Sequence, residues 1–88
     1  MLAKKESTAL LKKLKVISNK FRFEILRITS EKEYNITDLS STLKLSYTKC
    51  ADYVTMLANE GLVEKIKDGK ETKVRSKVKL SKDGVKFL

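Results

Sequence analysis

Apolar residues recur at helical spacing in the first part of the chain. Over residues 8–17, lysines flank four large apolar residues that fall on one side of a helix, namely Leu10, Leu11, Leu14 and Ile17. Ser7 or Thr8 can cap this helix, and residues 1–6 are expected to fray. A second helix is expected near 20–30, with Ser18-Asn19 at its start and an apolar side formed by Phe21, Ile25 and Ile28.

Residues 36–63 show the most regular pattern and predict two short helices joined by a tight turn. Leu39 and Leu43 lie one turn apart in the first helix, which Thr37 can cap. The turn Lys44-Leu45-Ser46 follows, and Ser46 can cap the second helix. Three apolar residues recur in that helix, namely Cys50, Val54 and Leu57. Gly61 then stands where a helix end favours positive φ. Such a helix pair, over 37–61, suits the DNA major groove, although a helical hairpin packed only for stability would look similar.

Two strands are expected after the helix pair, within residues 62–80. The segments 62–67 and 72–80 flank Asp68-Gly69, a strong signal for a hairpin turn. In the second strand, Ser76 shares one face with the apolar Val74, Val78 and Leu80, and the other face carries Lys73, Arg75, Lys77 and Lys79. Four cations on one face contribute little to folding. They either protect an edge strand from aggregation or bind phosphates, and both roles are compatible.

Two shorter segments complete the expected order of elements. Tyr34-Asn35-Ile36 can pair with the hairpin as a third strand. Ser81 can cap a final helical turn, in which Val85, Phe87 and Leu88 would return to the core or reach a partner chain. Because the chain has no proline, repeat or low-complexity linker, residues 1–88 are expected to form one domain. Its fold class is mainly α with a small β-hairpin.

The charge of the chain points to a polyanionic partner. The net charge is +9, and residues 1–20 and 62–88 each carry about +5 of it. A membrane-surface role would require aromatic anchors on the apolar side of a basic helix. The first helix has only Leu, Val and Ile there, so no membrane partner is expected.

The sequence offers little for catalysis or metal binding. It contains one cysteine and no histidine, so several Cys or His ligands cannot meet within one chain. It has no Gly-rich phosphate loop and no telling pair of carboxylates, so we expect no enzyme activity, no cofactor and no metal. Cys50 falls on the apolar side of its helix, which favours packing over redox sensing. Because neither a signal peptide nor a membrane span is evident, a cytoplasmic location is expected.

Two parts of the sequence resemble a known family. The segments ISNKFRFEILRIT and ITDLSSTLKLSYTKCADYVTMLANEGLVEK resemble the ArsR-like winged-helix transcription regulators. The ending GLVEKIKDGKETKVRSKVKLSKDGVKFL is similar to small archaeal winged-helix DNA-binding proteins. The resemblance covers about residues 16–88 and consists of apolar positions and turns, so it supports the fold more than the function.

The resemblance implies a winged helix-turn-helix, in which the hairpin is called the wing. Such families are usually dimeric repressors that contact DNA with the second helix of the pair and with the wing. The Cys and His ligands of ArsR-type metal sensors are lacking, so metal sensing does not carry over. A homodimer is expected to use the first helix, the last turn or both, and the candidate interface residues are Leu10, Leu11, Leu14, Ile17 and Phe87.

The helical spacing also indicates which residues would contact DNA. With Cys50, Val54 and Leu57 turned inward, the expected base-reading residues are Tyr47, Thr48, Lys49, Asp52 and Thr55. Asp52 repels phosphate, which favours sequence-specific recognition, although a local ion pair with Lys49 is an alternative. The expected phosphate contacts of the wing are Lys67, Lys70, Lys73, Arg75 and Lys77.

These observations predict a sequence-specific regulator of transcription that binds double-stranded DNA, a homodimeric repressor associated with the nucleoid. Two alternatives stay open. One is an architectural DNA-binding protein with weak sequence preference, and the other is a winged helix used only for protein contact within a larger assembly. Sequence preference at physiological salt separates the transcription regulator from the architectural protein. A lack of salt-dependent DNA binding would favour the winged helix used only for protein contact.

Overall fold

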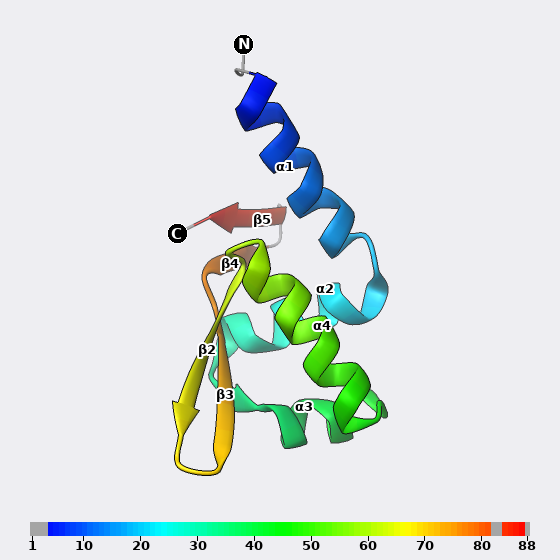
Figure 1. Cartoon of the computed structure of the whole chain (residues 1–88), viewed down its shortest axis with the longest axis vertical. Coiled ribbons are helices and arrows are strands. Elements are labelled where there is room, and N and C mark those ends of the chain that lie inside the picture. Colours follow the sequence, from blue (N-terminus) through cyan, green and yellow to red (C-terminus); the bar gives the residue numbers. More distant parts are fainter. Residues whose placement is uncertain (1–3, 82–83, 88) are drawn as a thin grey trace.

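The order of helices and strands follows the sequence pattern except at the end of the chain. The structure, a computed structural model, describes residues 4–81 and 84–87, and it describes the side chains of Thr8 and residues 11–78. The elements are α1 (Lys4–Ile17), α2 (Lys20–Glu31), β1 (Tyr34–Asn35), α3 (Ile36–Leu43), α4 (Tyr47–Asn59), β2 (Val63–Asp68), β3 (Glu71–Ser76), β4 (Val78–Ser81) and β5 (Gly84–Phe87). In Figure 1, α1 points away from the other helices, and the tip of the β2–β3 hairpin lies at the opposite end of the molecule. The predicted winged helix-turn-helix is confirmed.

Polar side chains cap the starts of α2, α3 and α4. Asn19 Oδ1 accepts hydrogen bonds from the backbone N–H groups of Phe21 and Arg22 at 2.9 and 3.1 Å, and Ser46 Oγ accepts one from Lys49 at 3.1 Å. Both caps were predicted. The predicted cap Thr37 is wrong, because α3 begins at Ile36 and Asn35 Oδ1 accepts from the N–H of Asp38 at 2.7 Å. Each cap satisfies a helical N–H group that has no partner within the helix.

Residues with positive φ stand at the ends of α3 and α4. Lys44 ends α3 with φ 57° and ψ 42°, a left-handed conformation that is uncommon for a residue other than glycine. At the end of α4, Gly61 has φ 71°, and the N–H of Leu62 donates to the carbonyl of Leu57 at 3.0 Å. The positive φ expected at Gly61 is therefore confirmed.

One hydrophobic core joins the last three helices to the base of the sheet. The side chains that are 0% exposed come from every part of it: Ile25, Leu26, Leu39, Cys50, Val54, Leu57, Leu62 and Val74. The half-buried Val16 and Ile17 pack the end of α1 against this core. The apolar spacing predicted for α2 and α4 thus corresponds to their buried sides.

The wing consists of β2 and β3, which pair antiparallel from Val63 opposite Ser76 to Asp68 opposite Glu71. A two-residue turn joins the strands, and its first residue, Gly69, has φ 64°, as hairpin turns of this length require. The short strand β1 pairs with the other edge of β3, which gives the strand order β1-β3-β2 and confirms the predicted third strand.

Three boundary predictions are wrong. The strand predicted over 72–80 is interrupted at Lys77, where the backbone N–H donates to the carbonyl of Leu62 at 2.8 Å. Ser76 Oγ also hydrogen-bonds both the N–H and the carbonyl of Val78, which turns the chain out of the wing. The first helix begins at Lys4, so Ser7 and Thr8 lie inside it and do not cap it.

The predicted final helical turn is the third error. Residues 84–87 form strand β5, which pairs antiparallel with β4, from Val78 opposite Phe87 to Ser81 opposite Gly84. Glycine disfavours a helix, and Val85 and Phe87 alternate with Gly84 and Lys86 as in a strand. Residues 82–83 and 88 lie outside the described residues.

Candidate nucleic-acid interface

Helix α4 presents a different set of side chains on each of its sides. Successive residues turn by about 100° around a helix, so Cys50, Val54 and Leu57 share the inner side, where all three are 0% exposed. Thr48 and Asp52 lie on the opposite, outer side and are exposed. The two flanks between these sides contact different parts of the molecule, one the wing and the other α2.

The flank toward α2 is held by the ring of Tyr53. This ring stacks on Phe21 with centroids 6.2 Å apart, and the guanidinium of Arg22 lies 5.4 Å from its centroid. Arg22 Nε also donates to the carbonyl of Val16 at 2.6 Å, which ties the end of α1 to the same cluster. Tyr53 therefore packs at the edge of the core and fixes α4 against two other helices.

Lys49 belongs to this flank and is exposed. Its ammonium lies 5.1 Å from the centroid of the Tyr53 ring, and Asp52 forms no ion pair within the described part of the chain. The local ion pair between Asp52 and Lys49 is therefore not found. Lys49 is the third residue of α4, and the first turn of this helix holds no acidic residue. A cation at the positive end of a helix is unfavourable by a few tenths to about 1 kcal/mol, so this position suits an external anion.

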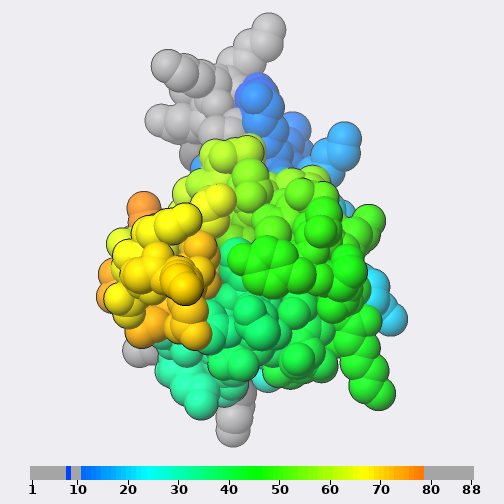
Figure 2. All heavy atoms as spheres, turned by 60° about the horizontal axis from the view of Figure 1, so that its bottom comes forward, coloured from blue at the N-terminus to red at the C-terminus, as the bar shows by residue number. Residues whose placement is uncertain are grey.

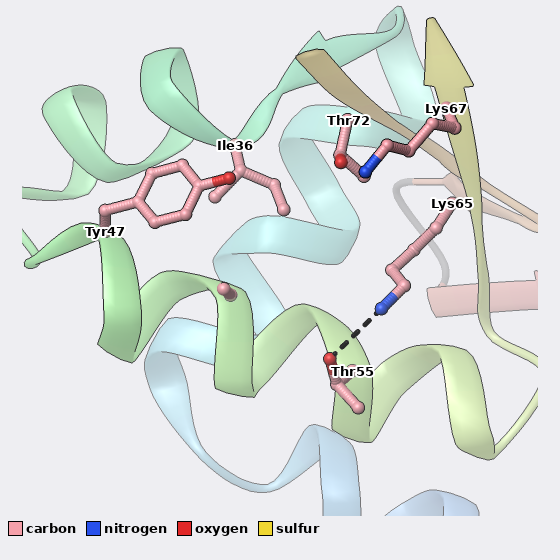
Figure 3. A pocket seen from close by; sticks show the side chains of 7 residues that line it. Ile36, Tyr47, Thr55, Lys65, Lys67 and Thr72 are labelled. Carbon is pink, nitrogen blue, oxygen red and sulfur yellow. Dashed lines mark hydrogen bonds between the residues drawn. The ribbon is translucent and has the colours of Figure 1, made fainter. Parts of the chain in front are cut away.

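A groove of about 390 Å³ separates α4 from the wing. Seven residues line it, namely Ile36, Tyr47, Ala51, Thr55, Lys65, Lys67 and Thr72. Figure 2 shows the face on which it opens, with the wing beside the surface of α3 and α4. In Figure 3 the Tyr47 ring extends toward Ile36, and the Lys67 side chain runs toward Thr72.

One hydrogen bond crosses the groove. Lys65 Nζ donates to Thr55 Oγ1 at 3.3 Å, so the wing and α4 are joined by polar atoms at this point (Figure 3). Thr55 and Tyr47 therefore line the groove, whereas Thr48, Lys49 and Asp52 lie on other sides of α4. The expected base-reading residues are all on the surface of α4, but they divide into these two groups.

The two faces of the wing carry different charges. The strand register places Lys65 and Lys67 on the face toward α4, opposite Val74 and Thr72. Lys65 was not among the predicted contacts. The alternation of β2 contained a signal for this face, because Lys65 lies two residues after the apolar Val63, which is 2% exposed.

The other face of the wing holds ion pairs. Lys73 Nζ lies 3.0 Å from Asp68 Oδ2, and Arg75 Nη2 lies 3.0 Å from Glu64 Oε2. Hydrogen bonding to Asp68 raises the pKa of Lys73, and hydrogen bonding to Glu64 raises the pKa of Arg75. Two of the cations expected to bind phosphate are therefore matched by carboxylates of the neighbouring strand.

The remaining predicted wing cations occupy separate places. Lys70 is exposed at the tip of the hairpin. Lys77 lies at the base of the wing, beside a second hollow of about 400 Å³ that Glu64, Arg75 and Ser76 also line.

The surface expected at a dimer interface is partly described. Leu11 and Leu14 of α1 are 65% and 50% exposed, and Ile17 is half-buried against the core. The side chains of Leu10 and Phe87 lie outside the described residues. Helix α1 thus offers at least two large apolar side chains to another molecule.

Cys50 fits a packing role. Its side chain is 0% exposed, and burial raises the pKa of the thiol to about 11. The thiol therefore keeps its proton at neutral pH, where a thiolate would be needed for reactivity. No group of three potential metal ligands occurs within the described residues, and no helix among them is long and apolar enough to cross a membrane.

A family model described as winged helix-turn-helix matches residues 12–88. The chain belongs to this family, which consists of DNA-binding regulators and not of enzymes. No curated protein matches the sequence. The resemblance to winged-helix regulators is confirmed at the level of the winged helix-turn-helix family and its fold.

Several solved structures are similar to this chain. Reduced HlyU from Vibrio cholerae is 28% identical with a TM-score of 0.76, and the match covers 82% of this chain and 76% of that one. The transcriptional repressor BigR from Xylella fastidiosa is 19% identical with a TM-score of 0.72, over 82% of this chain and 74% of that one. A third structure is the homodimeric winged helix-turn-helix DNA-binding domain Mb0332 from Mycobacterium bovis, a possible ArsR-family transcriptional regulator. It is 19% identical with a TM-score of 0.76, and the match covers 86% of this chain and 72% of that one. At 19% identity, the last two show the fold alone.

Proposed function

We propose that this chain is a sequence-specific regulator of transcription that binds double-stranded DNA as a homodimer and acts as a repressor. The observation that carries the proposal is the exposed start of α4. Thr48 and Asp52 point away from the core there, and Lys49 stands at the positive end of the helix without an acidic partner among the described residues. A helix of this kind can enter a major groove with its first two turns.

The chemistry of these side chains suits base edges. A lysine can donate to the N7 and O6 acceptors of guanine, a threonine methyl can contact the thymine methyl, and a carboxylate can accept from cytosine N4. Asp52 favours sequence-specific binding over an architectural role, because a carboxylate on a surface that met only phosphates would be repelled.

A dimer is supported by the apolar surface of α1 and by the homodimeric relative from Mycobacterium bovis. Repression is part of the proposal because BigR, which shares the fold, is a transcriptional repressor. In a twofold dimer, the two α4 helices would meet half-sites about 10 bp apart. We place this regulator in the cytoplasm, on the nucleoid.

Selection of bound sequences from a random DNA pool tests the proposal. We expect an enriched palindrome, and Thr48→Ala or Lys49→Ala should weaken binding to it by about 1–3 kcal/mol while changing binding to random DNA much less. Asn59→Ala, at the far end of the same helix, is the matched control. If Lys49→Ala weakens both kinds of DNA equally, α4 does not read bases and the architectural alternative replaces this function.

The dimer has its own test. Leu11→Glu combined with Leu14→Glu should give a monomer that keeps its helical content, because both side chains are already half or more exposed in one chain. Light scattering of the unaltered protein should show twice the 10.0 kDa chain mass. A measured mass equal to that of a single chain at every protein concentration would exclude the homodimer.

A further inference from the structure

We propose that the groove between α4 and the wing holds the sugar-phosphate backbone of one DNA strand, and that Thr55 positions Lys65 there instead of reading a base. The inference rests on the proposed function, since it concerns how the same surface binds DNA. It assigns a role to Lys65, and it changes the role expected for Thr55. Its consequence is that this pair supplies affinity for DNA of any sequence.

The hydrogen bond between Thr55 and Lys65 leaves donors free for a phosphate. An ammonium group has three N–H donors, and Lys65 Nζ uses one of them on Thr55 Oγ1 at 3.3 Å. The Thr55 hydroxyl accepts this bond, so its own O–H can donate to a second acceptor. A phosphate oxygen placed beside the pair can therefore receive hydrogen bonds from both side chains.

The charge of the groove is complementary to a polyanion. Lys65 and Lys67 enter it from neighbouring positions of one face of β2, and none of the described residues that line it is acidic. No carboxylate pairs with either lysine in the part of the chain that the structure describes. Each lysine can thus neutralise a phosphate and release its counterion.

The floor of the groove suits the sugar that joins two phosphates. Ile36 is 5% exposed and Ala51 is half-buried, and the Tyr47 ring extends beside Ile36 (Figure 3). These apolar surfaces lie next to the cationic wall, so a deoxyribose can pack where its phosphates are bound. Because Lys65, Lys67 and Tyr47 are all exposed, the groove is open to solvent and favours a strand passing through it over an enclosed small molecule.

Two conservative variants test the inference. Lys65→Met keeps most of the side chain but removes its charge, and Thr55→Val replaces a hydroxyl by a methyl of similar size. Lys65→Met should reduce the magnitude of the slope of log K against log salt concentration by about 0.9. At 0.1 M salt, this corresponds to an affinity that is about eightfold weaker. Thr55→Val should weaken selected and random duplexes by the same few-fold factor and leave the enriched sequence unchanged.

Arg75→Met is the matched control, because it removes one wing charge from the face that points away from α4. It should change the salt slope much less than Lys65→Met does. Thermal unfolding of each variant checks that the fold is retained, and Lys65→Gln repeats the measurement with a polar side chain.

Two outcomes would overturn the inference. A change of the preferred base at one position in the Thr55→Val selection would show that Thr55 reads that base. Equal loss of salt slope in Lys65→Met and Arg75→Met would show that only net charge matters. If the Thr48→Ala variant shows a loss of sequence preference in that case, the proposed function is retained although the inference about the groove fails. If the unaltered protein binds no DNA, both fail.

Discussion

The two faces of the wing have similar numbers of cations but differ in what surrounds them. On the face toward α4, Lys65 and Lys67 border a groove without acidic lining residues among those described. On the opposite face, Lys73 and Arg75 each lie 3.0 Å from a carboxylate of β2. A polyanion approaching the first face meets positive charge, whereas one approaching the second meets charges that are already balanced.

This difference shows that a row of cations along one strand does not by itself identify a binding surface. The regular alternation of Lys73 and Arg75 in the sequence predicted that they bind phosphate. Their partners, Asp68 and Glu64, are in the neighbouring strand, and the pairing becomes evident only with the register of the hairpin. Strand β2 also holds two cations, Lys65 and Lys67, and these are the ones that face α4.

The largest effect is expected from removing both charges of one face. Lys65→Ala with Lys67→Ala should reduce the salt slope of DNA binding by about 1.8, or about 60-fold in affinity at 0.1 M salt. Lys73→Ala with Arg75→Ala, which removes the same charge, should cost much less because each cation already has a carboxylate partner. Binding isotherms at several salt concentrations would measure both, and equal losses would contradict the comparison.

Stability should also differ between the faces. Val74 is 0% exposed on the face toward α4, whereas Ile66 on the other face is only half-buried. Val74→Ala should lower the free energy of unfolding by about 2 kcal/mol, and Ile66→Ala by less than about 1 kcal/mol. Urea unfolding would measure the two values. A larger loss at Ile66 would mean that another molecule covers the outward face.

A smaller effect is expected from removing the carboxylate partners of the two cations on the outward face. Glu64→Gln with Asp68→Asn keeps the side-chain shapes but removes the partners of Arg75 and Lys73. If the outward face lies within reach of DNA, the salt slope should rise by at most about 0.9 for each cation. An unchanged salt slope would show that the outward face lies away from the bound DNA, so that only the face toward α4 contacts it.

The smallest effect concerns the folding contribution of the ion pairs themselves. Both members of the Arg75–Glu64 pair are partly exposed, with side-chain exposures of 54% and 39%. A double-mutant cycle with Arg75→Met and Glu64→Gln should give a coupling of about 0.2–1 kcal/mol that weakens in high salt. A coupling well above this range would mean that the outward face is built for stability.

Local signals in the sequence determined the starts of α2 and α4 and the turn of the hairpin. Asn19 and Ser46 cap helices by accepting from N–H groups two or three residues away, and Gly69 provides the positive φ of the hairpin turn. The spacing of Cys50, Val54 and Leu57 likewise determined the buried side of α4. These interactions span a few residues, so their signals can be recognised in the sequence.

Tertiary structure alone decided the features that depend on partners far along the chain. Lys65 reaches Thr55 ten residues earlier, Arg75 pairs with Glu64, and Lys77 leaves the wing because its N–H meets the carbonyl of Leu62. The strand β5 is a more local case, because it pairs with β4 directly before it in the chain, from Ser81 opposite Gly84. The residue types permit each of these contacts. Which contacts form depends on the register of β2 against β3 and on the position of α4 beside the wing.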